Sequence, residues 1–268
     1  MKKTVFALGM LMSTGALAQG IALDWTTDST LATPESVLAT KDVLYVSLID
    51  GAGWDPDGKG GIALLEANGK IKNAKWVTGL HAPKGMAIVK GVLYTADLTD
   101  LVSVDLKTGK ILNKLKVDGA QGLNDVTADP QGNLYISDTR GGKVWKFSGG
   151  KAEIYLTDLK DANGVKWHQN KLYITANNAF LAYTPGTKTL DKICELENGG
   201  DGIEPYKDGF FVTSWLGYLY HVDKAGKRRT LRETHQTNKY KTADIGLMGD
   251  VLYVPTFFGN TVEAWKIK

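Results

Sequence analysis

One short strand pattern recurs six times along the chain: VLYVS at 43–47, VLYTA at 92–96, NLYIS at 133–137, KLYIT at 171–175, GFFVT at 209–213 and VLYVP at 251–255. The central aromatic residues of these segments follow one another at intervals of 38 to 49 residues. Segments rich in Val, Ile, Leu and Tyr favour β-strands. A repeat of about 40 residues is typical of a propeller blade, which has four short strands joined by turns.

The stretches between these segments favour an all-β fold. Turn sequences such as DPQGN at 129–133 and KTGK at 107–110 separate the strands, and no segment has the pattern of a long amphipathic helix. We therefore predict a six-bladed β-propeller with about four antiparallel strands per blade. Because an open ring would expose strand edges, the C-terminal strand at 261–267 should pair with residues near the N-terminus and close the ring. A β-sandwich or two separate domains are the alternatives.

The N-terminus has the pattern of a secretory signal peptide. A basic tip at 2–3 precedes an apolar run at 5–12, and small residues at 16 and 18 precede a cleavage site after Ala18. The apolar run is too short to span a bilayer. We predict that residues 1–18 are a signal peptide, that residues 19–268 form one propeller domain, and that the protein is periplasmic or secreted.

Charge and cysteine content exclude several classes of protein. The chain has 32 basic and 29 acidic residues, and two of its three excess positive charges lie in the expected signal peptide. The basic cluster KAGKRR at 224–229 is interpreted as a charged turn, so no nucleic-acid partner is expected. No apolar run elsewhere in the sequence approaches the length of a membrane span. Cys194 is the single cysteine and leaves no internal disulfide. We expect a monomer that takes a small-molecule substrate or ligand.

The repeat predicts a ring of polar residues at the centre of the propeller. The inner strand of each blade lines the central channel, so equivalent positions at the start of these strands should meet. Counting back ten residues from each central aromatic reaches Glu35, Lys84, Asp125, Asn163, Asp201 and Ala243. Asn124, eleven residues back, is the alternative in the third blade because its turn is longer.

Carboxylate and amide oxygens in this ring favour a hard cation. Ca²⁺ takes 6–8 oxygen ligands from such groups. The alternative is a ring of turn caps, because Asn and Asp often begin strands. The sequence therefore predicts a divalent metal, Ca²⁺ first, with structural caps as the competing interpretation.

These motifs resemble the SMP-30/gluconolactonase/LRE-like family, which is similar in fold to the paraoxonases. The resemblance runs over almost the whole chain after the signal peptide and rests on PES at 34–36, LND at 123–125 with DPQGNLY at 129–135, ANGV at 162–165 and GDGI at 200–203. It implies a propeller that holds a divalent cation, usually Ca²⁺, through Glu35, Asn163 and Asp201. Asn124 would lie close by as a further ligand or a substrate contact.

The resemblance also implies hydrolysis of lactones and related esters. The metal would polarise the carbonyl, while Asp201 or a neighbouring base activates water. One position departs from the pattern, because Lys84 stands where paraoxonase-like members carry a histidine. Lys84 is a candidate catalytic base if desolvated, a candidate contact for an anionic substrate, or a purely electrostatic group. His81, three residues upstream, could supply an imidazole.

Loops that follow the repeated strands should cluster on the face through which a ligand enters. Their aromatic and polar residues, with Asn124 and Asp125 from the ring, are the candidate substrate contacts. The loop candidates are Trp54, Arg140, Trp215 and Phe257. The alternative is ordinary packing between blades.

We therefore expect a metal-dependent hydrolase of lactones or related esters. The competing hypothesis is a non-catalytic propeller that binds a small ligand or a protein partner and uses the metal only for rigidity, because propellers serve many functions.

Overall fold

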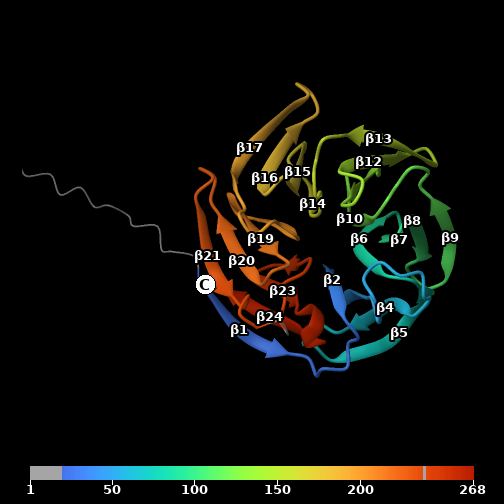
Figure 1. The fold of residues 1–268 in the computed structure, drawn as a ribbon. Helices are drawn as coiled ribbons and strands as arrows, with labels where there is room; N and C mark the ends of the chain where they lie inside the picture. Colours follow the sequence, from blue (N-terminus) through green and yellow to red (C-terminus); the bar gives the residue numbers. More distant parts are fainter. Residues whose placement is uncertain (1–19, 238–239) are drawn as a thin grey trace, which may run out of the picture.

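The computed structural model describes residues 20–237 and 240–268 and shows six sheets arranged in a ring (Figure 1). Each sheet has four antiparallel strands, which confirms the predicted six-bladed β-propeller. The one helix in the described ranges is a short 3₁₀ turn, η1 (Phe257–Gly259), and no helix there is long and apolar enough to cross a membrane. The predicted signal peptide, residues 1–18, lies outside the described residues and stays a prediction.

Five blades are continuous in sequence, and the sixth combines strands from both ends of the described chain. Blade 1 comprises β2 (Pro34–Ala39), β3 (Leu44–Leu48), β4 (Gly60–Leu65) and β5 (Ile71–Leu80), and blade 2 comprises β6 (Pro83–Val89), β7 (Val92–Asp97), β8 (Asp100–Asp105) and β9 (Ile111–Lys116). Blade 3 comprises β10 (Leu123–Ala128), β11 (Leu134–Asp138), β12 (Lys143–Ser148) and β13 (Lys151–Leu156), and blade 4 comprises β14 (Val165–His168), β15 (Lys171–Ala176), β16 (Ala179–Thr184) and β17 (Thr189–Glu195). Blade 5 comprises β18 (Ile203–Tyr206), β19 (Gly209–Ser214), β20 (Tyr218–Val222) and β21 (Arg228–Glu233), and blade 6 comprises β22 (Gly246–Met248), β23 (Val251–Pro255), β24 (Val262–Ile267) and β1 (Ile21–Thr26).

The ring closes as the sequence predicts. β1 pairs antiparallel with β24, with Ile21 opposite Ile267 and Thr26 opposite Glu263. In Figure 1 the blue β1 therefore lies along the red β24 at the outer edge of blade 6. This pairing gives the last blade its fourth strand and removes two free strand edges.

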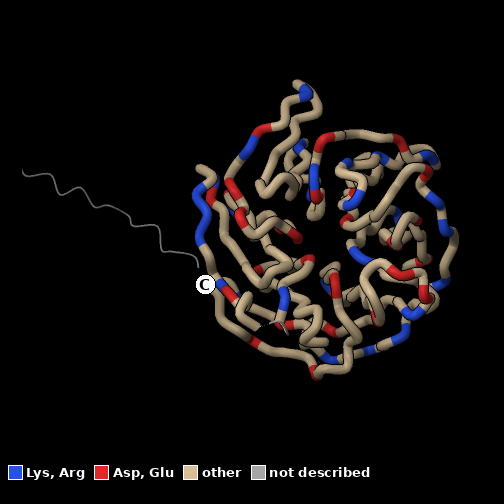
Figure 2. Tube along the Cα trace, viewed as in Figure 1, with Lys and Arg blue, Asp and Glu red and all other residues tan. Residues whose placement is uncertain are grey.

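The hydrophobic core lies between neighbouring blades rather than inside one sheet. The central aromatics of the repeated strands contribute to it, because they point from the second strand of one blade towards the next. Tyr135 of β11 is an example, since its ring stacks on Trp167 of β14 at 5.0 Å between ring centres. The repeated aromatic residues therefore form the contacts between neighbouring sheets, and the inner strands line the central axis. Acidic and basic segments both lie around that axis (Figure 2).

Candidate functional site

Strand pairing sets which residues of the inner strands are equivalent. Val37 lies opposite Val46 in blade 1, and Val126 lies opposite Ile136 in blade 3. The residue two positions before each of these inner-strand residues begins the channel wall, so in blade 3 it is Asn124 that is equivalent to Glu35. The structure thus resolves the choice between Asn124 and Asp125. The first ring comprises Glu35, Lys84, Asn124, Asn163, Asp201 and Ala243.

A second ring follows one position further along each inner strand. It comprises Ser36, Gly85, Asp125, Gly164, Gly202 and Asp244. Neighbouring members touch closely, because a Cβ at Gly85 would lie 2.1 Å from Asp125 Oδ1 and one at Gly202 would lie 2.6 Å from Asp244 Oδ1. Two small residues therefore separate one aspartate from the next around this ring, and their small size lets the six inner strands come close together on the axis.

Three oxygens of the first ring are buried and accept no hydrogen bond from any described residue. They are Glu35 Oε2, Asn163 Oδ1 and Asp201 Oδ1. An unpaired buried oxygen costs about 1–3 kcal/mol, and more when it is charged. Three such atoms from three different blades therefore point to a group that supplies positive charge on the axis.

Burial changes the proton affinity of the two carboxylates in this set. Burial raises the pKa of Glu35 to about 8, with the nearby Lys84 ammonium opposing the shift and Asp244 adding to it. Burial also raises the pKa of Asp201 well above its usual range, and the Glu35 carboxylate adds to that shift. Each group is thus a better proton acceptor than an exposed carboxylate, unless a bound cation replaces the proton.

The donor chemistry fits a hard cation. Two carboxylates and a carboxamide oxygen match the oxygen ligands of Ca²⁺. No group of three or more His, Cys, Asp or Glu side chains is placed to hold a metal within residues 20–237 and 240–268, so a metal set here depends on the Asn163 amide. Among the described residues, the buried side-chain oxygens without a hydrogen-bond partner belong to the predicted metal ligands Glu35, Asn163 and Asp201.

Asn124 and Asp125 lie at different levels of the channel. Asn124 is buried, and its Nδ2 donates to Thr139 Oγ1 at 3.0 Å, which leaves Oδ1 as the acceptor that can face the ring. Asp125 accepts hydrogen bonds from the amides of Val126 and Val165 at 2.6 and 2.7 Å. The Asp125 carboxylate thus joins blades 3 and 4 in the second ring, and its predicted role as a substrate contact stays a prediction.

Lys84 is buried beside the predicted metal ligands but donates to backbone oxygens. Its Nζ lies 2.7 Å from Gly53 O and 3.2 Å from Ala82 O. The ammonium also lies 4.3 Å from the centre of the Trp54 ring. Burial lowers the pKa of Lys84, and the nearby carboxylates, Glu35 first, oppose that shift. The two carbonyls and the ring favour the charged form, which supports the electrostatic role over that of a base.

The lower channel contains charged residues that sequence reasoning missed. Lys166 Nζ donates to Glu204 Oε1 at 2.8 Å, and Asp244 accepts from Ser36 Oγ at 2.5 Å. These side chains line a cavity of about 20 Å³ together with Asp125. Applying the same register one residue further along each inner strand would have found Asp244. Lys166 and Glu204 carry no such signal, because equivalent positions in other blades are apolar or small.

Two pairs of candidate loop residues meet on the face above the first ring. Arg140 lies 4.5 Å from the centre of the Trp54 ring, which joins the loops of blades 3 and 1. Trp215 and Phe257 lie 5.5 Å apart in blades 5 and 6. The structure therefore brings the loop candidates into two groups rather than one continuous wall.

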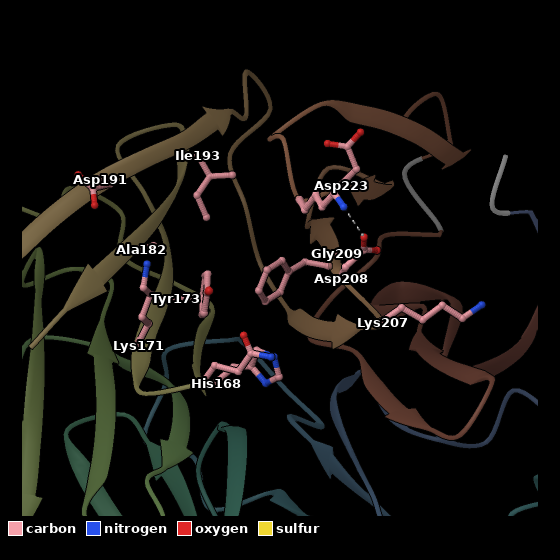
Figure 3. A pocket seen from close by; sticks show the side chains of 13 residues that line it. His168, Lys171, Tyr173, Ala182, Asp191, Ile193, Lys207, Asp208, Gly209 and Asp223 are labelled. Carbon is pink, nitrogen blue, oxygen red and sulfur yellow. Dashed lines mark ion pairs between the residues drawn. The ribbon is translucent and has the colours of Figure 1, made fainter. Parts of the chain in front are cut away.

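A separate pocket of about 500 Å³ lies away from the ring, between blades 4 and 5 (Figure 3). Tyr173 and Phe210 form its aromatic side, with ring centres 4.4 Å apart, and His168 lies beside them. An ion pair between Lys224 and Asp208 borders it. Sequence reasoning did not select this pocket, and none of its residues belongs to the predicted site.

Comparison with known proteins shows the fold but no family. No family model matches the sequence, and no curated protein matches it. A streptogramin B lyase structure matches with a TM-score of 0.70 at 9% identity, over 93% of this chain and 98% of its own. A catalytically inactive variant of virginiamycin B lyase from Staphylococcus aureus, solved with quinupristin, matches with a TM-score of 0.65 at 10% identity, over 92% and 99%.

A further similar structure is that of a candidate gluconolactonase. It matches with a TM-score of 0.68 at 15% identity, over 94% of this chain and 92% of its own. All these identities are too low to carry function. The structural neighbours, which include lyases and this candidate gluconolactonase, therefore show that the chain is a six-bladed propeller of the kind that such proteins share.

Proposed function

We propose that the protein is a hydrolase of lactones or related esters that depends on a divalent cation, Ca²⁺ first. The observation that carries the proposal is the set of three buried, unpartnered oxygens on Glu35, Asn163 and Asp201. The protein also shares its fold with a candidate gluconolactonase. Export to the periplasm or medium is part of the proposal and rests on the N-terminal sequence alone.

The ring residues have distinct parts in the proposed reaction. Glu35, Asn163 and Asp201 would hold the cation, with Asn124 beside them. When bound, a divalent cation polarises a carbonyl oxygen and stabilises the negative charge that develops on it. Asp201 is buried at the same position, and its carboxylate is the proposed acceptor of a proton from the attacking water.

In the proposed reaction, Asp201 takes up a proton from water and later gives it to the leaving group. Water forms a bond to the carbonyl carbon while its proton passes to the Asp201 carboxylate. The carbon–oxygen bond of the lactone or ester then breaks, and the same proton passes to the departing alkoxide. The products are an alcohol and a carboxylic acid, which releases its own proton to solvent at neutral pH; from a lactone, both groups belong to one hydroxy acid.

Lys84 is proposed to act through its charge. Its ammonium donates to Gly53 O and Ala82 O and contacts the Trp54 ring, so it is already held in place. The positive charge lies close enough to Glu35 to oppose the rise in that residue's pKa. Lys84 therefore favours the ionised form of the first-ring carboxylates, which the proposed chemistry needs.

Metal analysis and a substrate screen test the proposal on the full chain. We expect about one divalent ion per chain by elemental analysis, as the single oxygen set implies. In a screen of sugar lactones, homoserine lactones and aryl esters with added Ca²⁺, Asp201→Asn should reduce turnover by at least about a hundredfold. Asp191→Asn, which changes an exposed carboxylate on β17, is the matched control and should retain activity.

The outcomes separate the alternatives. Metal-free protein whose stability does not change on chelation would contradict the metal site. A bound metal without turnover of any lactone or ester would favour the non-catalytic binding propeller. Turnover that Asp201→Asn leaves intact would place the chemistry at other residues.

A further inference from the structure

The loop between β3 and β4, residues 49–59, is held over one side of the first ring by blade 2. Lys84 Nζ donates to Gly53 O at 2.7 Å, and Gly58 N donates to His81 Nδ1 at 3.1 Å. These two contacts anchor the loop on both sides of Trp54. The indole ring is therefore held in place rather than free to sample many positions.

Trp54 in turn holds Arg140, which enters from the loop that follows β11 in blade 3. The guanidinium carbon lies 4.5 Å from the centre of the indole ring, and the Lys84 ammonium lies 4.3 Å from the same centre. The backbone beneath leaves room for this arrangement, because a Cβ at Gly122 would lie 2.8 Å from Trp54 Cζ3 and 3.0 Å from Arg140 Cδ. Position 122 therefore needs a glycine, because any larger side chain would collide with the Trp54 and Arg140 side chains.

The guanidinium of Arg140 has no ion pair or hydrogen bond with any other residue in the described ranges. The carboxylate nearest in sequence, Asp138, is occupied by other donors. It accepts from the amides of Gln121, Gly122 and Gly141 and from Trp145 Nε1. Arg140 is exposed and borders a hollow of about 800 Å³ between residues 139–143 and 157–161. Its planar set of N–H donors is therefore orientated and available.

We propose that Arg140, seated on Trp54, binds a carboxylate group of the substrate and selects lactones or esters that carry one. A guanidinium recognises a carboxylate through two parallel hydrogen bonds, and stacking on an aromatic ring orientates it for that contact. The buried Lys84 contacts the same ring and adds positive charge, while its ammonium donates to Gly53 O and Ala82 O rather than to the ligand. This inference rests on the proposed function for the reaction, whereas the anion contact itself is independent of it.

A matched pair of probes tests the selection. The first probe is 5-oxotetrahydrofuran-2-carboxylate, a γ-lactone with a side-chain carboxylate, and the second is its uncharged carboxamide. With Ca²⁺ present, Arg140→Gln should raise KM for the carboxylate about ten- to hundredfold, because a pair of charge-assisted hydrogen bonds is lost. KM for the carboxamide should change much less. Arg140→Lys should recover only part of the loss, because an ammonium lacks the planar pair of donors.

A binding measurement makes the anion contact testable without turnover. Titration calorimetry with 2-hydroxyglutarate, the hydrolysis product of the first probe, should show an affinity that Arg140→Gln lowers by about the same factor. Lys146→Gln is the control, because it removes one positive charge from β12 of the same blade, where the ammonium lies 5.6 Å from the Tyr135 ring. The control should leave the affinity unchanged.

The two proposals fail in different ways. Anion binding that depends on Arg140 but comes without turnover of any lactone supports the anion site and contradicts the hydrolase. Turnover of both probes with equal KM, or equal affinity of Arg140→Gln and the unaltered protein for 2-hydroxyglutarate, overturns the anion site. Absence of measurable binding to the unaltered protein overturns it as well.

Discussion

At the residue scale, the carboxylates of the channel are governed by burial more than by neighbouring charge. Asp244 shows this, because burial raises its pKa to about 7 although Ser36 donates to it and the Lys166 ammonium lies near. The Lys166 ammonium is paired with Glu204 and cannot fully compensate a second acid. A buried carboxylate without its own counterion binds a proton more tightly in the folded state than in the unfolded one.

This difference predicts how Asp244 changes stability with pH. Its folded pKa of about 7 exceeds the ordinary value of 3.8, so its stabilising contribution is complete below about pH 4 and is lost as the pH rises through about 7. Asp244→Asn stays uncharged, so its free energy of unfolding should rise relative to the unaltered protein between pH 4 and 8. Chemical unfolding across that range measures the difference.

The matched control for this experiment is Asp191→Asn. Both variants remove one carboxylate, and Glu35, Asp125 and Asp201 titrate in all three proteins. The pH-dependent difference therefore belongs to Asp244 if only Asp244→Asn shows it. A difference that does not change with pH would mean that Asp244 is ionised throughout and has a charge partner at all pH values.

At the scale of the element, the inner strands depend on small residues in the second ring. Gly164 precedes β14, and a Cβ there would lie 1.8 Å from the backbone oxygen of Asp201 in the next blade. This is a backbone atom of a proposed metal ligand, so it cannot move aside without moving the site. The glycine thus determines how closely blades 4 and 5 approach on the axis.

We expect Gly164→Ala to disturb both stability and cation binding. Overpacking of this kind costs about 1–3 kcal/mol in free energy of unfolding, and the forced shift of the Asp201 backbone should weaken Ca²⁺ binding. Thermal unfolding and calorimetric titration with Ca²⁺ measure the two effects. Gly186→Ala is the control, because a Cβ there meets nothing within 4 Å. Equal behaviour of the two variants would show that the inner strands tolerate wider spacing.

At the scale of the whole molecule, the ring is held closed by β1, which comes from the opposite end of the chain to β24. Trp25 of β1 contributes apolar contact to this closure, because its ring lies 5.9 Å from Tyr253 of blade 6. The same ring reaches blade 1, where a Cβ at Gly69 would lie 2.6 Å from Trp25 Cε3. One side chain of the closing strand thus packs against its own blade 6 and against the neighbouring blade 1.

Trp25→Ala should therefore weaken the closure of the ring. Because Trp25 is half-buried, we expect a loss of about 2–3 kcal/mol in free energy of unfolding, below the 3–5 kcal/mol typical of a fully buried tryptophan. Leu23→Ala on the same strand is the control, because Leu23 is 52% exposed. Denaturant unfolding of both variants measures the difference. A loss as small as that of Leu23→Ala would mean that backbone pairing alone closes the propeller.

The fold could be predicted because its cause is local and repeated. Each blade carries the same aromatic strand, such as VLYVS at 43–47 and VLYVP at 251–255, and each aromatic fills the space between two sheets. The first ring could be predicted for the same reason, since a regular repeat places equivalent residues at equal depth on one axis. Glu35, Asn163 and Asp201 were selected by that regularity and by the family resemblance.

The sequence by itself thus determined the six blades and five of the six first-ring residues, because both follow from the repeat within each blade. It also predicted the closure, because an open ring would leave strand edges unpaired. Only the tertiary structure decided which of Asn124 and Asp125 faces that ring, and that Lys84 donates to the backbone oxygen of Gly53. It also decided that Arg140 meets Trp54 from another blade. Such contacts join residues that are far apart in the chain. The loops that carry these residues differ in length from blade to blade, so the repeat does not predict which loop residues contact each other.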